Sequence, residues 1–518
     1  MAAIAKGFSG NPSVRKVWAS FAKGYNSVRQ AQDMTPDELS DVLNLRYIAT
    51  PSGVGLTNRP GMVKCTTTPI AGGSYPIKDL HKYVNTSGTV KYMAVCNSAA
   101  YMSTGGTPPN WSFSSLGTLA GARGRMVNFA GKCIVADGAA PKKYDGASWG
   151  TCTSTSGSPP NPTFLAVHGD RLFANDGSKK NGVFYCNVRD PEDWNTANAA
   201  GTIYLSESNE ITAFSKFYDK LLLHGIAPKN VMALTGTTPT DIAVTRAIPG
   251  AAAVGPDQAI VLSNDVLFMD APGIISFRAW QNYGDIEQAI VSDPVSNVIM
   301  PMVANTVVAG RHPIDQQAWF YDGSTNPAIL YVYDAQYGIW TMYHLELGTT
   351  QTPTCIADFD GVLYVGTSDG HVWRMDTSNT IFQDGAIPYG ISWKGNAEDF
   401  GTLRKKLIRR YLPGVTMGAG ATGYACLYKD LGAVPLVQVS VSGPPLRIVG
   451  TMTAGSDTIN TSGFTPTYLV NEAGGIVINQ LLNFEATYLQ IGMSTVLCNN
   501  ARLTINPHVI EAAVLSRY

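Results

Sequence analysis

The side chains most suited to chemistry do not fall into the spacing of a known catalytic or metal site. The chain carries no His-Glu-x-x-His, Gly-x-Ser-x-Gly, phosphate-binding loop or dinucleotide-binding pattern. Its seven histidines lie far apart and lack the short spacing of metal ligands, so we expect each to serve in a turn or a core. They are His81, His168, His224, His312, His344, His371 and His508.

One acidic segment has the residue types for glycoside hydrolysis, which uses a pair of carboxyl groups. It runs from Asp190 to Trp194 and includes Glu192 and Asp193. The same residues also form the pattern of a turn that a proline begins and a tryptophan anchors. We therefore predict that the protein is not an enzyme, and we keep carbohydrate binding or cleavage by surface loops as the alternative.

The sequence contains neither acidic residues nor cysteines at the spacing of a metal-binding site. The turns at Asn175–Ser178 and Asp322–Ser324 lack the further acidic ligand of a calcium loop. The eight cysteines contain no Cys-x-x-Cys pair, and several lie inside apolar runs, so we interpret them as buried, reduced thiols of a protein made in a reducing cytosol. We predict no cofactor and no metal.

The strongest charge feature is a basic cluster near the start of the C-terminal region. It consists of Arg404, Lys405, Lys406, Arg409 and Arg410. The cluster is either a solvated face or a contact with phosphate or with an acidic partner surface. In a regular strand, Arg404, Lys406 and Arg410 would share one face, and the other two cations would share the opposite face. We expect that second face to pair with nearby acids such as Glu398 and Asp399.

Composition indicates a β-rich protein with little charge. Gly 52, Pro 30 and Tyr 24 favour strands and tight turns over a helical bundle. A net charge of −1 argues against a protein that grips nucleic acid, and a charged fraction of only 14% suggests that partner subunits cover much of the surface. No apolar segment is long enough to span a bilayer, and residues 1–15 lack the apolar core of a secretory signal.

A unit of two short apolar runs joined by a tight turn recurs along the middle of the chain. Its clearest copies are Val167–Phe173 and Phe359–Val365, and the turn centres fall at residues 88, 131, 169, 219, 265, 323 and 360. The mean period, (360 − 88)/6, is about 45 residues, which is typical of a β-propeller blade. We predict an all-β fold with a propeller of six to eight blades over residues 75–378.

Two further segments flank the predicted propeller. Residues 1–74 form an N-terminal segment, in which Met34–Leu45 has a proline after a capping threonine and acids in the first turn, as a short helix would. In residues 379–518 the Asp-Gly turns stop after Asp384-Gly385, and Thr/Ser/Gly-rich strand patterns follow. This pattern indicates a β-sandwich-like platform domain.

Several short segments, in order along the chain, resemble propeller proteins from the tails of short-tailed bacteriophages. The order of the matches carries more weight than any single one. The matching segments are Asp37–Leu45, Gly55–Gly61, Phe164–Phe173, Asp190–Trp194, Asn264–Met269 and Gly273–Phe277.

The resemblance implies a tail nozzle, also called tubular tail protein B, or a related head-closure protein. Such a protein forms a ring, usually a hexamer, below the portal and adaptor proteins of the virion tail, after synthesis in the cytoplasm of the host bacterium. The ring continues the channel through which double-stranded DNA leaves, and it presents sites for tail fibres or spikes. The family supplies no catalytic residues. A near-neutral charge suits a conduit, because a strongly basic lumen would hold the phosphate backbone.

Reversing the charge of Arg404 and Lys406 tests the basic cluster. We expect the double variant R404E/K406E to enter particles poorly while its thermal midpoint stays unchanged, because exposed ion pairs contribute only about 0–1 kcal/mol. Particle incorporation and thermal unfolding are the measurements. Normal incorporation together with normal infectivity would identify the cluster as a solvated face.

Overall fold

The computed structural model divides the chain into two compact units. The platform consists of Met1–Gly61, Tyr337–Glu346 and Ser378–Tyr518, and the propeller of Met62–Gln336 and Leu347–Thr377. The structure describes residues 13–514 except 19, 52, 107, 109, 122, 154–155, 263, 285, 303–306, 324–327, 349–350, 402, 404, 413, 418–420, 443–467, 471–474, 479, 487, 499–500 and 506–507.

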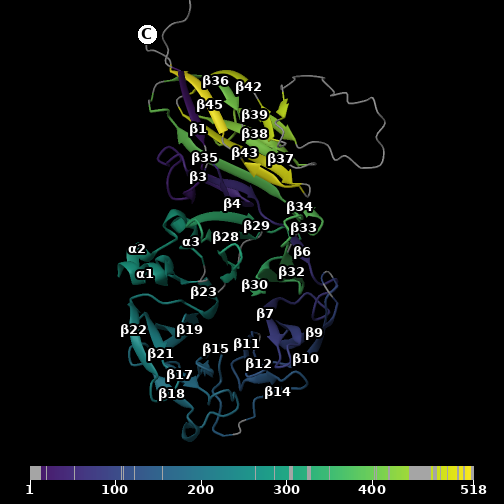
Figure 1. Ribbon diagram of the computed structural model, residues 1–518, viewed down its shortest axis with the longest axis vertical. Coiled ribbons are helices and arrows are strands. Elements are labelled where there is room, and N and C mark those ends of the chain that lie inside the picture. Colours follow the sequence, from purple (N-terminus) through teal and green to yellow (C-terminus); the bar gives the residue numbers. More distant parts are fainter. Residues whose placement is uncertain are drawn as a thin grey trace, which may run out of the picture. The chain divides into compact units, whose positions relative to one another are not determined.

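The described residues of the propeller form seven groups of three or four neighbouring antiparallel strands, which we number as blades 1 to 7 (Figure 1). They are, in order, β7–β10 (Ile77–Val84, Val90–Cys96, Ala99–Gly105, Ser112–Thr118), β11–β14 (Arg125–Phe129, Lys132–Ala136, Lys142–Tyr144, Trp149–Thr151), β15–β18 (Leu165–His168, Arg171–Ala174, Gly182–Tyr185, Gly201–Tyr204), β19–β22 (Glu210–Phe217, Lys220–Ile226, Asn230–Thr235, Ala243–Pro249), β23–β25 (Ala259–Leu262, Asp265–Asp270, Gly273–Ser276), β26–β28 (Val308–His312, Gln317–Tyr321, Ile329–Asp334), and β30–β32 with β6 (Pro353–Phe359, Val362–Thr367, Val372–Met375, Met62–Lys64).

The first strand of each blade is the inner strand, and the seven inner strands close a ring. Each packs beside the inner strand of the next blade, and β30 of blade 7 packs against both β26 and β7. In Figure 1 the labels of β7, β11, β15, β19, β23 and β30 surround a common centre. Blade 7 receives its outer strand, β6, from the N-terminal side of the chain, where Trp373 pairs with Lys64. The predicted β-propeller is confirmed, and its blade number falls within the expected range.

Apolar cores fill the spaces between neighbouring blades. Between blades 1 and 2, for example, Met93 and Val95 pack with Met126 and Val135. Between blades 3 and 4, Phe173 belongs to the same buried cluster as Leu221 and other residues of blade 4. A single blade therefore has no core of its own and is stable only between its neighbours.

The recurring turns join the first and second strands of the blades. At Ala130-Gly131, Gly169-Asp170 and Asp360-Gly361, both turn residues have positive φ, as two-residue hairpins of the right twist require. One copy was placed wrongly. Gly323 lies after β27, at the second hairpin of blade 6, whereas the first turn of that blade lies between His312 and Gln317.

Helices occur in the described residues mainly after β25 of blade 5. They are α1 (Phe277–Tyr283), α2 (Ile286–Ala289) and α3 (Ser296–Ile299), with short 3-10 turns at Thr196–Asn198 (η1), Pro256–Gln258 (η2) and Asp293–Val295 (η3). Helix α1 begins at Ser276, whose hydroxyl accepts a hydrogen bond from the backbone N–H of Ala279 at 2.9 Å. It ends at Gly284, which has a φ of +70°.

The predicted N-terminal helix is wrong, because Glu38–Leu43 forms strand β3. A bulge at Ser40 breaks the pairing register with β35 between Leu39 and Asp41. The extra residue places Leu39 and Val42 in the core despite a spacing of three, which imitates a helix. Glu38, expected in a first helical turn, instead accepts a hydrogen bond from the N–H of Thr35 at 2.6 Å.

The platform contains three main sheets built from both ends of the chain. They are β29-β3-β35-β43-β38-β39 (Ile339–His344, Glu38–Leu43, Gly390–Glu398, Leu489–Cys498, Ala421–Lys429, Val437–Ser442) with β2 (Gly24–Tyr25) on β3, β4-β5-β44-β37-β41-β40 (Leu45–Thr50, Gly53–Asn58, Leu503–Ile505, Gly414–Met417, Gly475–Ile478, Tyr468–Val470), and β1-β45-β36-β42 (Ser13–Trp18, His508–Val514, Lys406–Leu412, Gln480–Ala486); β33 (Gln383–Asp384) pairs with β34 (Ile387–Pro388).

The strand pairings do not follow the expected division of the chain into residues 1–74, 75–378 and 379–518. Strands β1 to β5 belong to the platform, so the platform is not purely C-terminal. Strand β6 belongs to blade 7, and β29 belongs to the platform although it lies inside the range 75–378. The β-sandwich-like platform thus requires strands from regions far apart in the sequence.

A buried ion pair joins two segments of the platform that are distant in the sequence. The guanidinium of Arg59 is fully buried and donates to both carboxylate oxygens of Asp384, at 2.9 and 2.5 Å. It lies 4.1 Å from the ring centroid of Tyr389 and donates further to the backbone oxygen of His344 at 2.7 Å. Nearby, position 61 requires a glycine, because a Cβ there would lie 2.1 Å from the backbone oxygen of Gln383.

Removing one charge of this pair should destabilise the platform strongly. We expect Asp384→Asn to lower the free energy of unfolding of the platform by about 3–5 kcal/mol, because it leaves the Arg59 charge buried without a counter-ion. Calorimetric unfolding measures the change. Lys180→Met, which breaks the exposed pair with Glu210, is the control and should cost no more than about 1 kcal/mol. A loss for D384N as small as that of the control would contradict the central role of the pair.

Candidate functional site

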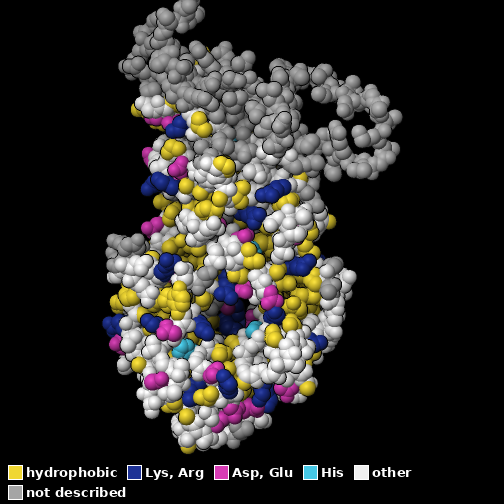
Figure 2. Space-filling view, in the orientation of Figure 1, with side chains coloured by type: hydrophobic (Ala, Val, Ile, Leu, Met, Phe, Trp, Pro, Cys, Tyr) yellow, Lys and Arg dark blue, Asp and Glu magenta, His cyan; other side chains and the backbone are white. Residues whose placement is uncertain are grey.

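Charged side chains gather in the channel that the inner strands enclose. Figure 2 shows a hollow at the centre of the propeller face, with Lys and Arg side chains inside it. These side chains come together because they occupy equivalent positions of neighbouring inner strands. The residue before the last in the inner strand is Lys216 in blade 4, Val261 in blade 5, Arg311 in blade 6 and Asp358 in blade 7. These four residues line one cavity.

A second group of charges crosses the channel. Asp257 lies in η2, which packs against the inner strands of blades 4 and 6. Its carboxylate forms ion pairs with Arg123 and Arg125, which lie at the start of blade 2. The distance from the Nη2 atom of Arg125 to Asp257 is 2.8 Å, and the Nη1 atom of Arg125 donates to the backbone oxygen of Thr163 at 3.1 Å. Because blades 2 and 5 are not neighbours, these pairs bridge the channel.

Asp79 of β7 stands beside this bridge. Its carboxylate accepts hydrogen bonds from the backbone N–H groups of Leu80 at 2.9 Å and Met126 at 3.0 Å. Burial raises the pKa of Asp79 to about 7, against the opposing influence of Arg125. Asp79 is therefore the carboxyl group of the channel whose charge changes near neutral pH.

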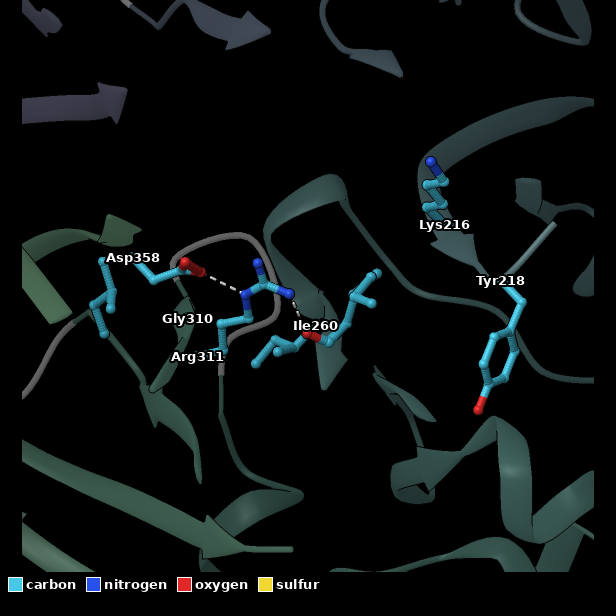
Figure 3. A pocket seen from close by; sticks show the side chains of 9 residues that line it. Lys216, Tyr218, Ile260, Gly310, Arg311 and Asp358 are labelled. Atoms are coloured by element: carbon cyan, nitrogen blue, oxygen red, sulfur yellow. Dashed lines mark hydrogen bonds and ion pairs between the residues drawn. The ribbon is translucent and has the colours of Figure 1, made fainter. Parts of the chain in front are cut away.

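The cavity has a volume of about 620 Å³ and is lined by inner strands of four consecutive blades (Figure 3). Arg311 donates from its Nε atom to Asp358 at 2.5 Å and from its Nη1 atom to the backbone oxygen of Val261 at 3.0 Å. Lys216 and Tyr218 line the part of the cavity formed by blade 4. Tyr218 is 65% exposed.

The acidic segment considered for catalysis holds two blades together. Glu192 is buried and accepts from Lys143 at 2.7 Å and from Lys132 at 2.9 Å, both residues of blade 2. Burial opposes ionisation, but the hydrogen bonds from these lysines lower the pKa of Glu192 to about 2. The Nε1 atom of Trp194 donates to the backbone oxygen of Pro191 at 2.8 Å, as expected for an anchored turn.

His224 and the described cysteines are buried in the protein core. His224 is fully buried, lies 2.8 Å from the hydroxyl of Ser215, and has its pKa lowered by burial to about 3. The prediction of buried thiols is confirmed for the seven described cysteines, Cys65, Cys96, Cys133, Cys152, Cys186, Cys355 and Cys426. Within the described ranges, no three His, Cys, Asp or Glu side chains converge as metal ligands. None of the helices in the described part of the chain is long and apolar enough to cross a membrane.

The structure separates the members of the predicted basic cluster. Arg404 lies outside the described residues, and Lys405 is exposed. Lys406, Arg409 and Arg410 belong to β36, where a bulge between Ile408 and Arg410 interrupts the expected alternation of faces. Glu398, expected to pair with the cluster, forms its ion pair with Lys16 at 2.8 Å. Whether the cluster contacts a partner or DNA stays a prediction.

The sequence analysis missed the channel residues, although a signal for them was present. Aligning the repeats on their first turns would have brought Lys216 and Asp358 to one equivalent position, but not Arg311, because the turn of its blade was assigned to Gly323. The pairing of Asp257 with Arg123 has no such signal, because it depends on closure of the ring.

Comparisons with known proteins find only distant structural likenesses. No protein family matches the chain, and no curated sequence does. The chain is similar to the extracellular domain of the one component system BT4673 from Bacteroides thetaiotaomicron, with 11% identity and a TM-score of 0.42 over 75% of this chain and 57% of that one. BamB from Moraxella catarrhalis has 10% identity and a TM-score of 0.35, over 67% of this chain and 95% of that one. This chain thus spans little more than half the length of BT4673.

The pKa of Asp79 predicts a pH dependence of stability. From about pH 4 to about pH 7 the folded protein keeps a proton that the unfolded chain has lost, since the pKa is about 7 in the fold and 3.8 as the ordinary value. We therefore expect this group to lower the free energy of unfolding as pH rises through that window, by at most about 1.4 kcal/mol per pH unit, with no further change above it.

Urea unfolding of Asp79→Asn and of the unchanged protein between pH 5 and pH 8 isolates this contribution. Other groups cancel in the difference, so the advantage of the variant should grow up to about pH 7 and then level off. A difference that is flat over the whole range would show that Asp79 is ionised throughout.

Proposed function

We propose that this protein is a structural subunit of a bacteriophage tail nozzle. Copies of it form a ring, a hexamer in the related proteins, that continues the DNA ejection channel below the portal and adaptor. The virion tail is its place of action. The ring also carries the sites for tail fibres or spikes.

The residues that carry the resemblance support this proposal because they hold the fold together. In the segment Gly55–Gly61, Asn58 donates to the backbone oxygen of Ala501 at 3.0 Å, and Arg59 forms the buried ion pair. In Phe164–Phe173, the buried Arg171 donates to the backbone oxygens of Cys186 at 2.8 Å and Ala199 at 2.7 Å. Residues tied to the backbone in this way serve a scaffold.

The observation that carries the proposal is an exposed apolar group on one hairpin of the platform. Leu431, Val434 and Leu436, in and after the turn between β38 and β39, are 43%, 78% and 53% exposed. We call these three residues the hairpin patch. An apolar group of this kind on a projecting hairpin suits an interface between subunits, which is richer in apolar and aromatic residues than the remaining surface.

The path of DNA follows from the bridge across the propeller channel. Since Asp257 pairs with Arg123 and Arg125 across that channel, the propeller axis is not the conduit. In the proposed ring, DNA passes through the space that several copies enclose. A net charge of −1 allows it to pass without strong binding to phosphate.

Substitutions in the hairpin patch test ring formation. We expect V434D/L436D to remain folded but to lose self-association, because two carboxylates would have to be buried in an apolar interface. Sedimentation velocity of the purified protein and electron microscopy of particles are the measurements. Met300→Asp, at a propeller residue that is 56% exposed, is the matched control and should form rings normally. An unchanged protein that is a single copy both in solution and in particles would contradict the proposal.

A further inference from the structure

We propose that the cavity between blades 4 and 7 binds a sugar that carries one negative charge, such as a sugar acid. This inference is independent of ring formation. It rests on four side chains that line the cavity, Lys216, Tyr218, Arg311 and Asp358.

Arg311 is held in place before any ligand arrives. Its Nε atom donates to Asp358, and its Nη1 atom donates to the backbone oxygen of Val261. These two bonds lie on opposite sides of the guanidinium and fix its orientation. Gly310 beside it lets the neighbouring inner strand approach, because a Cβ at that position would lie 2.4 Å from the side chain of Ile356. A preorganised donor of this kind loses little entropy when a ligand binds.

Lys216 supplies a cation without a counter-ion. Among the described residues its amine has no ion pair, whereas Lys82 and Lys229 in the same propeller are each paired with an aspartate. Lys216 also lines a second hollow with His168 and Thr237. Its charge contributes to a lowered pKa of His168, after the larger effect of burial, so the imidazole adds no second positive charge at neutral pH.

Tyr218 supplies an aromatic surface at a cost to the backbone. It is 65% exposed and has a φ of +51°, a conformation that a bulky residue adopts with strain. Other copies of this turn have smaller residues at the equivalent position, namely Ala130, Gly169 and Asp360. Strain retained at an exposed tyrosine indicates a role for the ring beyond folding.

Charge and size together define the ligand. The lining residues include two cations, Lys216 and Arg311, and one anion, Asp358, so their net charge is +1. This charge suits a single carboxylate better than a phosphate monoester such as a nucleotide, which carries more than one negative charge at neutral pH. A volume of about 620 Å³ accommodates one or two sugar rings. Lys216 binds the anionic group on the blade 4 side of the cavity, where Tyr218 offers an aromatic surface to the sugar ring, and the fixed guanidinium of Arg311 donates to the sugar from the blade 6 side.

Titration of the full-length protein with D-glucuronate, D-glucose and adenosine monophosphate tests the site. We expect saturation-transfer NMR and calorimetry to show glucuronate binding, with glucose at least tenfold weaker. Lys216→Met should reduce glucuronate affinity at least tenfold, towards that of glucose. Lys220→Met, four residues along the same hairpin and outside the cavity lining, is the matched control and should bind as the unchanged protein does.

Tyr218→Gly separates a binding role from a structural one. Glycine relieves the positive φ, so its thermal midpoint should equal or exceed that of the unchanged protein, while glucuronate binding should fall at least tenfold. Equal binding by K216M or Y218G, tighter binding of adenosine monophosphate than of glucuronate, or no binding of any probe would each overturn the assignment.

Discussion

Closure of the ring is the constraint on which the propeller depends. No blade has a core of its own, because clusters such as that of Met93 and Met126 lie between blades. The pairing of Trp373 with Lys64 adds the outer strand that completes blade 7. Closure also determines what the channel contains, since equivalent positions of the inner strands meet at its wall. The cavity and the charges that cross the channel are consequences of the same geometry that stabilises the sheets.

The features of the fold that depend on local chemistry could be predicted from the sequence. Turns such as Gly169-Asp170 require positive φ at two successive residues, and few residue types adopt it readily, so the blade period was evident. The anchored turn at Asp190–Trp194 and the buried cysteines were also evident, because a tryptophan after a proline turn and thiols in apolar runs have few other roles. The copy assigned to Gly323 was wrong because only the second hairpin of blade 6 has an Asp-Gly turn, whereas the first turns at residues 313–316 without a glycine.

The remaining features depend on residues that are distant in the sequence. Ser40 occupies a bulge because its strand pairs with β35, and that pairing gave Leu39 and Val42 the spacing of a helix. Asp384 belongs to the last Asp-Gly pair and looked like another blade turn, yet it is the buried partner of Arg59. Asp257 meets Arg123 only after three blades have been placed between them. No local pattern contains the partner in any of these cases, so the site could not be predicted with the fold.

The pairing of the first described strand with the last sets an order of events during synthesis. Ser13 pairs with Ala513, so β1 waits for β45 until every propeller strand has left the ribosome. The inner ring, in contrast, is complete once β32 has been made. A nascent chain therefore passes through a stage with a finished propeller and an unfinished platform. In the ring that we propose, such a chain joins others only after β38 and β39 have been made.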